Sequence, residues 1–185
     1  MILCQTDRLL IRTYEKRDAI DVQRVMGCSE TYATTHMIPK DYPMKRAYWW
    51  FGFLASSHKN GTGYEFGMFD IYTGEYIGNI GLIAVNKSSR NASITYIIHP
   101  EKWGQNYATE GGSAMLSFGF ERLELEKVSG ACMVHNIGSA RVMEKLGFKS
   151  EGISRHDILK DGKYIDIAKY SILRDEFFGE GNENR

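Results

Sequence analysis

The segment HPEKWGQNYATEGG, His99 to Gly112, decides how this chain folds. The run before it, NASITYII, alternates in the manner of a β-strand. From Trp103 to Thr109 the chain is a short polar stretch without acidic side chains, and an apolar pattern with helical spacing follows it. The sequence therefore predicts a strand that ends at Ile98, a tight loop, and a helix that begins near Ala108.

The predicted loop has the chemistry of an anion site. The first turn of a helix leaves its backbone N–H groups without internal acceptors, and the positive end of the helix dipole adds to their pull on a phosphate. Gly104 lets the backbone approach a ligand, Asn106 tolerates a left-handed conformation, and Thr109 adds a hydroxyl donor. The nearest acid, Glu110, can face away. An ordinary strand-to-helix turn remains the alternative, whereas a Walker loop would need a lysine and a second glycine that are missing.

Composition excludes several classes of protein. A chain of 185 residues is most simply one domain. Its 23 Lys and Arg balance 23 Asp and Glu, which predicts no nucleic-acid partner and no membrane partner. Three distant cysteines without metal-ligand spacing indicate reduced thiols, no metal, and a cytoplasmic location. We expect no signal peptide, and no apolar run approaches the roughly 18 residues of a membrane span.

Strand and helix patterns alternate along the chain in the order of a mixed α/β (α+β) domain. About seven strands are expected, at residues 8–14, 63–70, 77–85, 92–98 and 127–134 and as two strands joined by a turn within 152–173. Helical spacing is found at residues 15–27, 44–59, 109–123 and 136–148. We expect a single domain over residues 1–175 and a polar tail over 176–185. The aromatic side chains of 44–59 would pack in the core or line a substrate groove.

Several of these segments resemble one family. WGQNYATE is similar to the pyrophosphate-binding loop of the GNAT acetyltransferases, Gln/Arg-x-x-Gly-x-Gly/Ala. NIGSARVMEKLGF, Asn136 to Phe148, resembles the Asn-x-x-Ser/Ala…Glu-Lys-x-Gly-Phe helix of that family. TDRLLIR, Thr6 to Arg12, resembles the first strand of its RimJ/RimL-like branch, which acetylates protein N-termini, notably of ribosomal proteins. GEYIGNIGL and ITYIIHPEKWG fit the same branch, so the resemblance runs from Thr6 to about Asp175.

The resemblance implies a fold and a co-substrate. The fold would be GNAT-like, with a mixed, mostly antiparallel central sheet flanked by helices and a V-shaped splay between the fourth and fifth predicted strands. Acetyl-CoA would enter that splay. Its pantetheine arm would pair with the backbone of Ile97, Ile98 and His99. Its pyrophosphate would be held by the N–H groups of Gly104, Gln105, Asn106, Tyr107, Ala108 and Thr109. The thioester would be flanked by Asn136 and Ser139, and the adenosine phosphate approached by Lys145.

The sequence departs from the family pattern at four positions. Trp103 stands where Gln or Arg is usual, as the RimJ/RimL-like branch permits, and Asn106 replaces the middle glycine. Met143 occupies the position where many members carry a tyrosine acid, and Ser93 the position where several carry a glutamate base. The binding half of the motif is present, but two familiar catalytic groups are absent.

Catalytic candidates follow from what acetyl transfer needs. Ser139 is the candidate proton donor to the leaving thiolate, although it could be a helix hydroxyl that only bonds the backbone. His135 is the candidate base because it titrates near neutrality, although a surface histidine at a strand end is the alternative. Tyr96 and Glu65 are weaker candidates. Water could also carry the proton, since an amine with a pKa of about 8 needs little help.

We therefore expect an enzyme that moves an acetyl group from acetyl-CoA to a primary amine. The favoured acceptor is the α-amine of a protein or peptide, with a ribosomal protein N-terminus as partner. A small-molecule amine, such as an amino acid, a polyamine or an antibiotic, is the second hypothesis, and a CoA-binding module without activity is the third. Residues 29–59 and 153–172 would build the acceptor groove. Aromatic residues from Trp49 to Phe53 would permit a homodimer.

Overall fold

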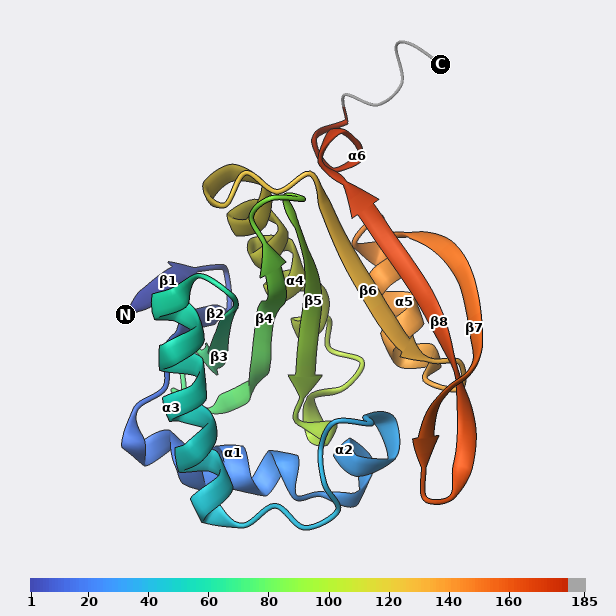
Figure 1. Ribbon diagram of the computed structural model, residues 1–185. Helices are drawn as coiled ribbons and strands as arrows, with labels where there is room; N and C mark the ends of the chain where they lie inside the picture. The colour runs from blue at the N-terminus through green and yellow to red at the C-terminus, as the bar shows by residue number, and fades with distance from the viewer. Residues whose placement is uncertain (180–185) are drawn as a thin grey trace.

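One eight-stranded sheet organises the computed structural model, which describes residues 1–179. Its strand order is β1-β2-β3-β4-β5-β6-β8-β7 (Figure 1). The sheet contains the seven expected strands and one that the sequence analysis missed, the short N-terminal strand β1. The bounds are β1 Ile2–Gln5, β2 Leu9–Arg12, β3 Tyr64–Asp70, β4 Tyr76–Asn86, β5 Asn91–Ile98, β6 Lys127–Met133, β7 Lys149–Lys160 and β8 Lys163–Leu173.

Helices cover both faces of this sheet. Figure 1 shows α1 and α3 in front of it, and α4 and α5 behind it. The short helix α2 was also missed, because its six residues carry no clear apolar period. The helical bounds are η1 Lys16–Asp18, α1 Ala19–Met26, α2 Ser29–Thr34, α3 Met44–Asn60, η2 Pro100–Lys102, α4 Tyr107–Ser117, the π-helical turn η3 Phe118–Arg122, α5 Ile137–Lys145 and α6 Arg174–Phe178.

The predicted V-shaped splay is present in the sheet. β5 and β6 form its one parallel pair within residues 1–179, and their register runs only from Asn91↔Lys127 to Ser93↔Ser129. All other neighbouring strands are antiparallel. Beyond Ser93 the two strands diverge (Figure 1). The splay lies between the strands predicted as fourth and fifth, which are β5 and β6 because β1 adds one strand at the N-terminus.

Successive side chains of each strand point to opposite faces of the sheet, so the hydrophobic core is divided between those two faces. Phe66 and Met68 of β3 belong to the cluster that includes the buried side of α4. Phe69 turns to the opposite face, where it packs with Tyr76 and with the apolar residues of α1. Each large apolar side chain buried in this way stabilises the fold by about 1.5–3 kcal/mol. The sheet is thus anchored on both faces up to the point where it splits.

The C-terminal end adds a small apolar contact. Phe177 and Phe178 of α6 lie with ring centroids 5.2 and 6.3 Å from that of Phe120. The predicted polar tail therefore begins inside a packed helix at residue 176, and residues 180–185 of that tail lie outside the described residues. Within residues 1–179, no helix has the length and apolar character that crossing a membrane requires.

Candidate active site

The loop between β5 and α4 has the backbone conformation that its sequence predicts. Gly104 has φ +73°, and Asn106, the N-cap of α4, has φ +68° and ψ +9°, so both are left-handed. The prediction that Asn106 can take glycine's place there is confirmed. Because of these two residues, the chain turns sharply from the strand end into the first turn of α4.

This loop presents a row of free main-chain donors. The first hydrogen bond into α4 runs from the Glu110 N–H to the Asn106 carbonyl, at 3.0 Å. The N–H groups from Gly104 to Thr109 meet no acceptor among residues 1–179. Unpaired donors at the N-terminus of a helix attract an anion, because the helix dipole is positive at that end. The donor set therefore fits a phosphate or diphosphate.

Arg8 keeps negative charge away from these donors. Its guanidinium pairs with Glu110 at 2.6 Å, donates to the Gln105 carbonyl at 3.1 Å and lies over the Tyr107 ring at 4.3 Å. Burial alone would raise the pKa of Glu110, but hydrogen bonds from Thr6 and Arg8 outweigh it and hold that pKa below its ordinary value. The one acid of the first turn thus faces β2, as the sequence analysis expected, and its charge is neutralised there.

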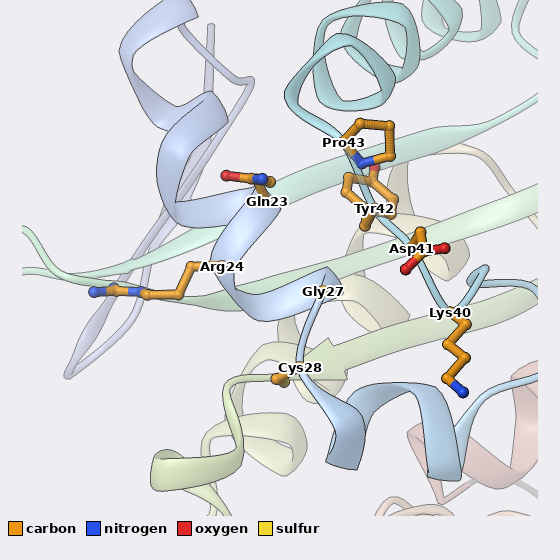
Figure 2. A pocket seen from close by; sticks show the side chains of 8 residues that line it. All are labelled: Gln23, Arg24, Gly27, Cys28, Lys40, Asp41, Tyr42 and Pro43. Carbon is orange, nitrogen blue, oxygen red and sulfur yellow. The ribbon is translucent and has the colours of Figure 1, made fainter.

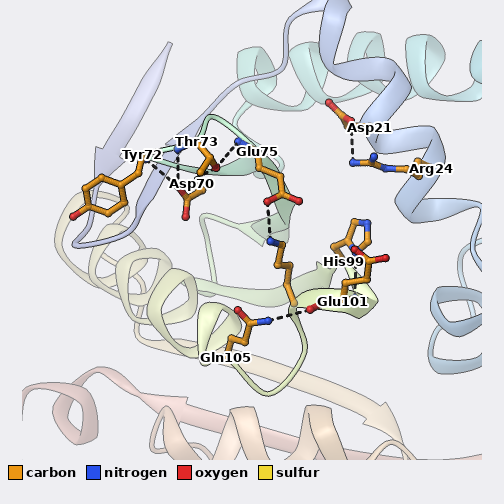
Figure 3. A network of polar contacts seen from close by, with 10 residues as sticks. Asp21, Arg24, Asp70, Tyr72, Thr73, Glu75, His99, Glu101 and Gln105 are labelled. Atoms are coloured by element: carbon orange, nitrogen blue, oxygen red, sulfur yellow. Dashed lines mark hydrogen bonds and ion pairs between the residues drawn. The ribbon is translucent and has the colours of Figure 1, made fainter.

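Polar contacts hold the first part of the loop, next to the β3–β4 turn, as Figure 3 shows. Lys102 pairs with Glu75 of the β3–β4 turn at 2.7 Å, and the Gln105 amide donates to the Glu101 carbonyl at 3.0 Å. The His99 ring accepts from the Glu101 N–H at 3.2 Å. The loop is consequently held in shape from both sides before any ligand arrives.

The end of β5 offers fewer main-chain groups than predicted. The His99 N–H donates to the Ile77 carbonyl of β4 at 2.8 Å, and the Ile98 carbonyl accepts from the Trp103 indole at 2.9 Å. Trp103 thus ties the loop to the strand. Because main-chain groups alternate between the two edges of a strand, the Ile98 N–H faces the splay and the main chain of Ile97 faces β4. Of the three predicted residues, Ile98 has its N–H at the open edge.

The start of α5 closes the other side of the splay. Asn136 caps the helix through its side-chain oxygen, which accepts from the Ser139 N–H at 3.0 Å, and its amide group donates to the Thr34 carbonyl of α2 at 3.1 Å. The hydroxyls of Ser139 and Tyr96 lie 2.8 Å apart and join α5 to β5. The Lys145 ammonium lies 3.4 Å from the Asn106 side-chain oxygen, so α5 also adds a positive charge at the loop.

Tyr96 is a donor and not a base in this setting. Burial raises its pKa, so the phenol keeps its proton, although the hydrogen bond to Ser139 acts the other way. Burial also raises the pKa of the Cys132 thiol, which has a hydrogen bond with Ser139. Ser139 is therefore held between two protonated groups, a position suited to passing a proton to a thiolate in the splay.

His135 lies apart from this network. It occupies the exposed turn between β6 and α5, and its ring has no hydrogen bond with any other residue of 1–179. The structure brings Ser139, Asn136 and Lys145 to the splay, but it gives the predicted histidine base no partner that would orient it.

Besides Glu110, a second acid, Glu65, is notable because its side chain is buried. Its side chain is 8 % exposed and accepts from the Asn79 amide at 3.1 Å and from the side chain of Trp50. Burial raises the pKa of Glu65 to about 7, and these two hydrogen bonds limit the rise. In the aromatic segment of α3, Trp50 and Phe51 pack against the buried cluster around α1, as the core alternative expects, whereas Trp49 and Phe53 are exposed.

A cavity of about 630 Å³ opens between the end of α1 and the segment that leads into α3 (Figure 2). Its wall is formed by Gln23, Arg24, Gly27, Cys28, Lys40, Asp41, Tyr42 and Pro43. Tyr42 belongs both to this wall and to the buried cluster around α1, and burial raises its pKa to about 12. The wall of the cavity therefore reaches the buried cluster on the face of the sheet that carries α1.

A comparison with protein families agrees with the family that the sequence resembles. The model of the GNAT acetyltransferase domain matches residues 8–149. The chain belongs to the GNAT acetyltransferase family. The uncharacterized N-acetyltransferase YoaA of Bacillus subtilis (strain 168) is 29% identical over 174 residues, covering 93% of this chain and 97% of YoaA.

Other relatives of this GNAT chain have names that state a substrate. The [ribosomal protein uS5]-alanine N-acetyltransferase of Escherichia coli (strain K12) is 25% identical over 170 residues, 87% of this chain and 85% of its own. The spermidine N(1)-acetyltransferase of the same strain is 29% identical over 107 residues, 58% of each chain. A structure of RimL, a ribosomal L7/L12 alpha-N-protein acetyltransferase in complex with coenzyme A, has a TM-score of 0.85 at 16% identity. The match covers 94% of this chain and 98% of the RimL chain. The uS5-alanine N-acetyltransferase agrees with the RimJ/RimL-like branch, and the RimL structure shows the same fold.

The structure shows the surroundings of Met143 and Ser93, the two positions where familiar catalytic groups of the family are absent. Met143 is 1 % exposed and packs against the strand β6, where an added methyl at Gly130 would lie 2.6 Å from its sulfur. Its side chain therefore fills the core. Ser93 pairs with Ser129 at the closed end of the splay, away from the strand end that meets the loop.

The buried acid makes stability depend on pH. Because the pKa of Glu65 is about 7 in the folded protein against an ordinary 4.5, folding favours the protonated form, and stability falls as the pH rises from 4.5 through 7. Glu65→Gln removes this dependence. We expect its free energy of unfolding, relative to the natural protein, to gain about 2–3 kcal/mol between pH 5 and pH 8 in urea titrations. A constant difference across that range would contradict the assignment.

Proposed function

We propose that this protein transfers the acetyl group of acetyl-CoA to a primary amine, and that the acceptor is the α-amine of a protein or peptide N-terminus. The observation that carries the proposal is the row of free N–H groups from Gly104 to Thr109, at the mouth of the β5–β6 splay. The RimL neighbour, which is a complex with coenzyme A, supports a binding site for that co-substrate in this fold.

The residues present fit acetyl-CoA as a ligand. The free donors ahead of α4 would hold its diphosphate, and Lys145 would add charge at the same loop. The unpaired edge of β5 would hold the pantetheine arm through the Ile98 N–H. Acetyl-CoA supplies an acyl group activated as a thioester. The chain holds the two substrates in a reactive orientation. In well-oriented intramolecular reactions, such positioning corresponds to effective molarities of about 10⁵ M or more.

Two groups of the chain serve the transfer itself. A main-chain N–H near Ile98 would stabilise the oxyanion that develops on the thioester carbonyl, a contribution of about 3 kcal/mol in comparable sites. Ser139, hydrogen-bonded to the protonated Tyr96, would give a proton to the leaving thiolate. His135 stays a prediction for the base, without structural support. A cytoplasmic location, where acetyl-CoA and reduced thiols coexist, is part of the proposal.

The cavity at α1 favours a peptide over a polyamine as the acceptor. Among the eight residues that line it, Asp41 is the one acid, whereas Arg24 and Lys40 are cationic. A polyamine carries several positive charges and is bound best by a cluster of carboxylates. A small-molecule amine is the second candidate acceptor, because one relative is a spermidine acetyltransferase.

The first test is a turnover assay that detects the free thiol of CoA. Peptides with free α-amines should give the highest kcat/KM, at least about tenfold above spermidine and free amino acids, because the cavity lacks an acidic cluster. The same peptides with acetylated N-termini are the control and should give none. A preference for spermidine would favour the second hypothesis, and CoA binding without turnover on any amine would favour the third.

The loop can be tested separately by calorimetry with CoA. Asn106→Glu places a carboxylate at the mouth of the donor row, and we expect it to abolish detectable binding through charge repulsion. Asn106→Gly is the matched control, because glycine keeps the left-handed conformation and adds no charge. Its affinity should stay within about threefold of the natural protein, the effect of weakening one exposed contact. Unchanged affinity in Asn106→Glu would refute the pyrophosphate assignment.

Ser139 can be separated from binding by comparing kcat with affinity. Ser139→Ala keeps the cap of α5, because the Asn136 oxygen accepts from the Ser139 main chain. We expect kcat to fall about 10²-fold, the lower range for a lost proton transfer, while the Kd of acetyl-CoA changes little. Ser139→Thr retains a hydroxyl and should recover part of the rate. An unaltered kcat in Ser139→Ala would remove the serine from the mechanism.

A further inference from the structure

Glu65 and Asn79 form a buried polar pair on the α3-covered face of the sheet, and the pair is not fully satisfied. Asn79 is 1 % exposed, and its side-chain oxygen has no hydrogen-bond partner among the described residues. A buried carbonyl oxygen without a donor costs about 1–3 kcal/mol, and such groups usually mark a site that a ligand or water completes. One acceptor beside a carboxylate suits a ligand with several N–H donors and a positive charge.

The backbone creates room for this pair. Gly81 of β4 lies opposite Glu65 of β3, and an added methyl at Gly81 would stand 2.4 Å from the Glu65 Cγ. The glycine thus lets the acid lie across β4 and meet Asn79. A side chain at position 81 would displace the carboxylate, so the glycine preserves the arrangement.

The pair lies close to the strand where transfer would occur. Asn79 is the cross-strand partner of Ile97 in β5, and directly opposed residues are separated by about 4.5–5.5 Å. Their side chains share a face of the sheet, and Ile97 packs with the cluster that contains Tyr42 of the cavity wall. The pair therefore lies one strand away from the splay, on the face of the sheet where Tyr42 joins the cavity wall to the buried cluster.

Among the titratable side chains around Glu65, the neighbours keep their protonation state near neutral pH, whereas Glu65 changes its charge there. Tyr14, Tyr42 and Tyr76 all have pKa values raised chiefly by burial and stay protonated. From α3, His58 accepts from the Glu65 N–H at 3.0 Å, and burial lowers its pKa, so it is neutral. The Arg46 guanidinium lies over the Tyr42 ring at 5.8 Å.

We propose that Glu65 and Asn79 are the acceptor end of the active site, where an unhindered primary ammonium group is bound and deprotonated. The proposal rests on the acetyl-transfer function above. The Asn79 oxygen accepts one N–H of the ammonium, and the Glu65 carboxylate accepts a second. Trp50 and the amide of Asn79 hold the carboxylate in place. Secondary amines and acetylated N-termini present fewer N–H donors and bind less well.

The chemistry balances with the acetyl group as the only group transferred. Glu65 takes one proton from the ammonium, and the neutral nitrogen attacks the thioester carbonyl. The C–N bond forms, the C–S bond breaks, and the second proton of the attacking nitrogen passes to the thiolate through Ser139 and Tyr96. The products are an amide and the free thiol, and the proton on Glu65 returns to solvent. No further reactant is needed.

A test that does not require turnover uses the full-length protein saturated with CoA. The probe is the peptide Ala-Gly-Ser-Ala amide, titrated by calorimetry at pH 7.5. We expect Glu65→Gln and Asn79→Ala each to weaken its binding at least about tenfold, the effect of losing one charged or buried hydrogen bond. Glu121→Gln, an exposed acid outside the site, should bind as the natural protein does. The N-acetylated peptide should not compete.

A kinetic readout separates a base from a structural acid. The loss of kcat/KM in Glu65→Gln should be about 10²-fold at pH 7 and shrink by at least about tenfold at pH 9.5, where the α-amine is already neutral. A structural defect would be the same at both pH values. Equal peptide affinity in Glu65→Gln and the natural protein, or no affinity in either, overturns the proposal. Transfer activity that persists unchanged in Glu65→Gln overturns it and leaves the function intact, whereas Glu65-dependent peptide binding without any transfer contradicts the function alone.

Discussion

The pairing of β5 with β6 stops after three residues, and the rest of the site depends on that interruption. Parallel strands joined side by side normally satisfy each other's main-chain groups, so a pair that separates leaves one edge of β5 unpaired. The protein tolerates this because one buried cluster joins the two halves of the sheet on the face that carries α4 and α5. α4 packs on β2, β4 and β5, and α5 packs on β6 and on α4. The divergence opens a slot for an extended ligand that can pair with β5 as a strand would.

Long-range contacts give the phosphate loop its shape. Arg8 is remote in sequence from the loop, yet it neutralises Glu110 and bonds the Gln105 carbonyl. Trp103 fixes the loop to the end of β5, and Lys102 fixes it to the β3–β4 turn. The main-chain donors are therefore already oriented. A ligand that meets oriented donors loses less conformational entropy on binding than one that must order the loop.

The buried pair Glu65 and Asn79, which we propose as the acceptor end, shows a different balance between stability and function. A carboxyl with its pKa raised by burial destabilises the folded protein at neutral pH, and the unpartnered oxygen of Asn79 adds to that cost. The hydrophobic clusters on both faces of the sheet act against this cost, because burying apolar side chains stabilises the folded protein. Groups that are unfavourable for folding and lie close to a reactive strand are what a site needs when it must hold and deprotonate a charged nitrogen.

The sequence by itself determined the local features of this protein. The strand that ends at Ile98, the left-handed Asn106, the helix that follows it and the Asn136 cap of α5 could be predicted, because backbone conformation and capping depend on neighbouring residues. The short elements β1 and α2 escaped prediction, because four to six residues carry too little periodicity. Only the tertiary structure decided that Arg8 faces Glu110, that Tyr96 meets Ser139, and that Glu65 lies against Asn79. The physical reason is that strand register and helix packing bring these groups together from distant positions, and no local pattern encodes which side chains will meet or how deeply they will be buried.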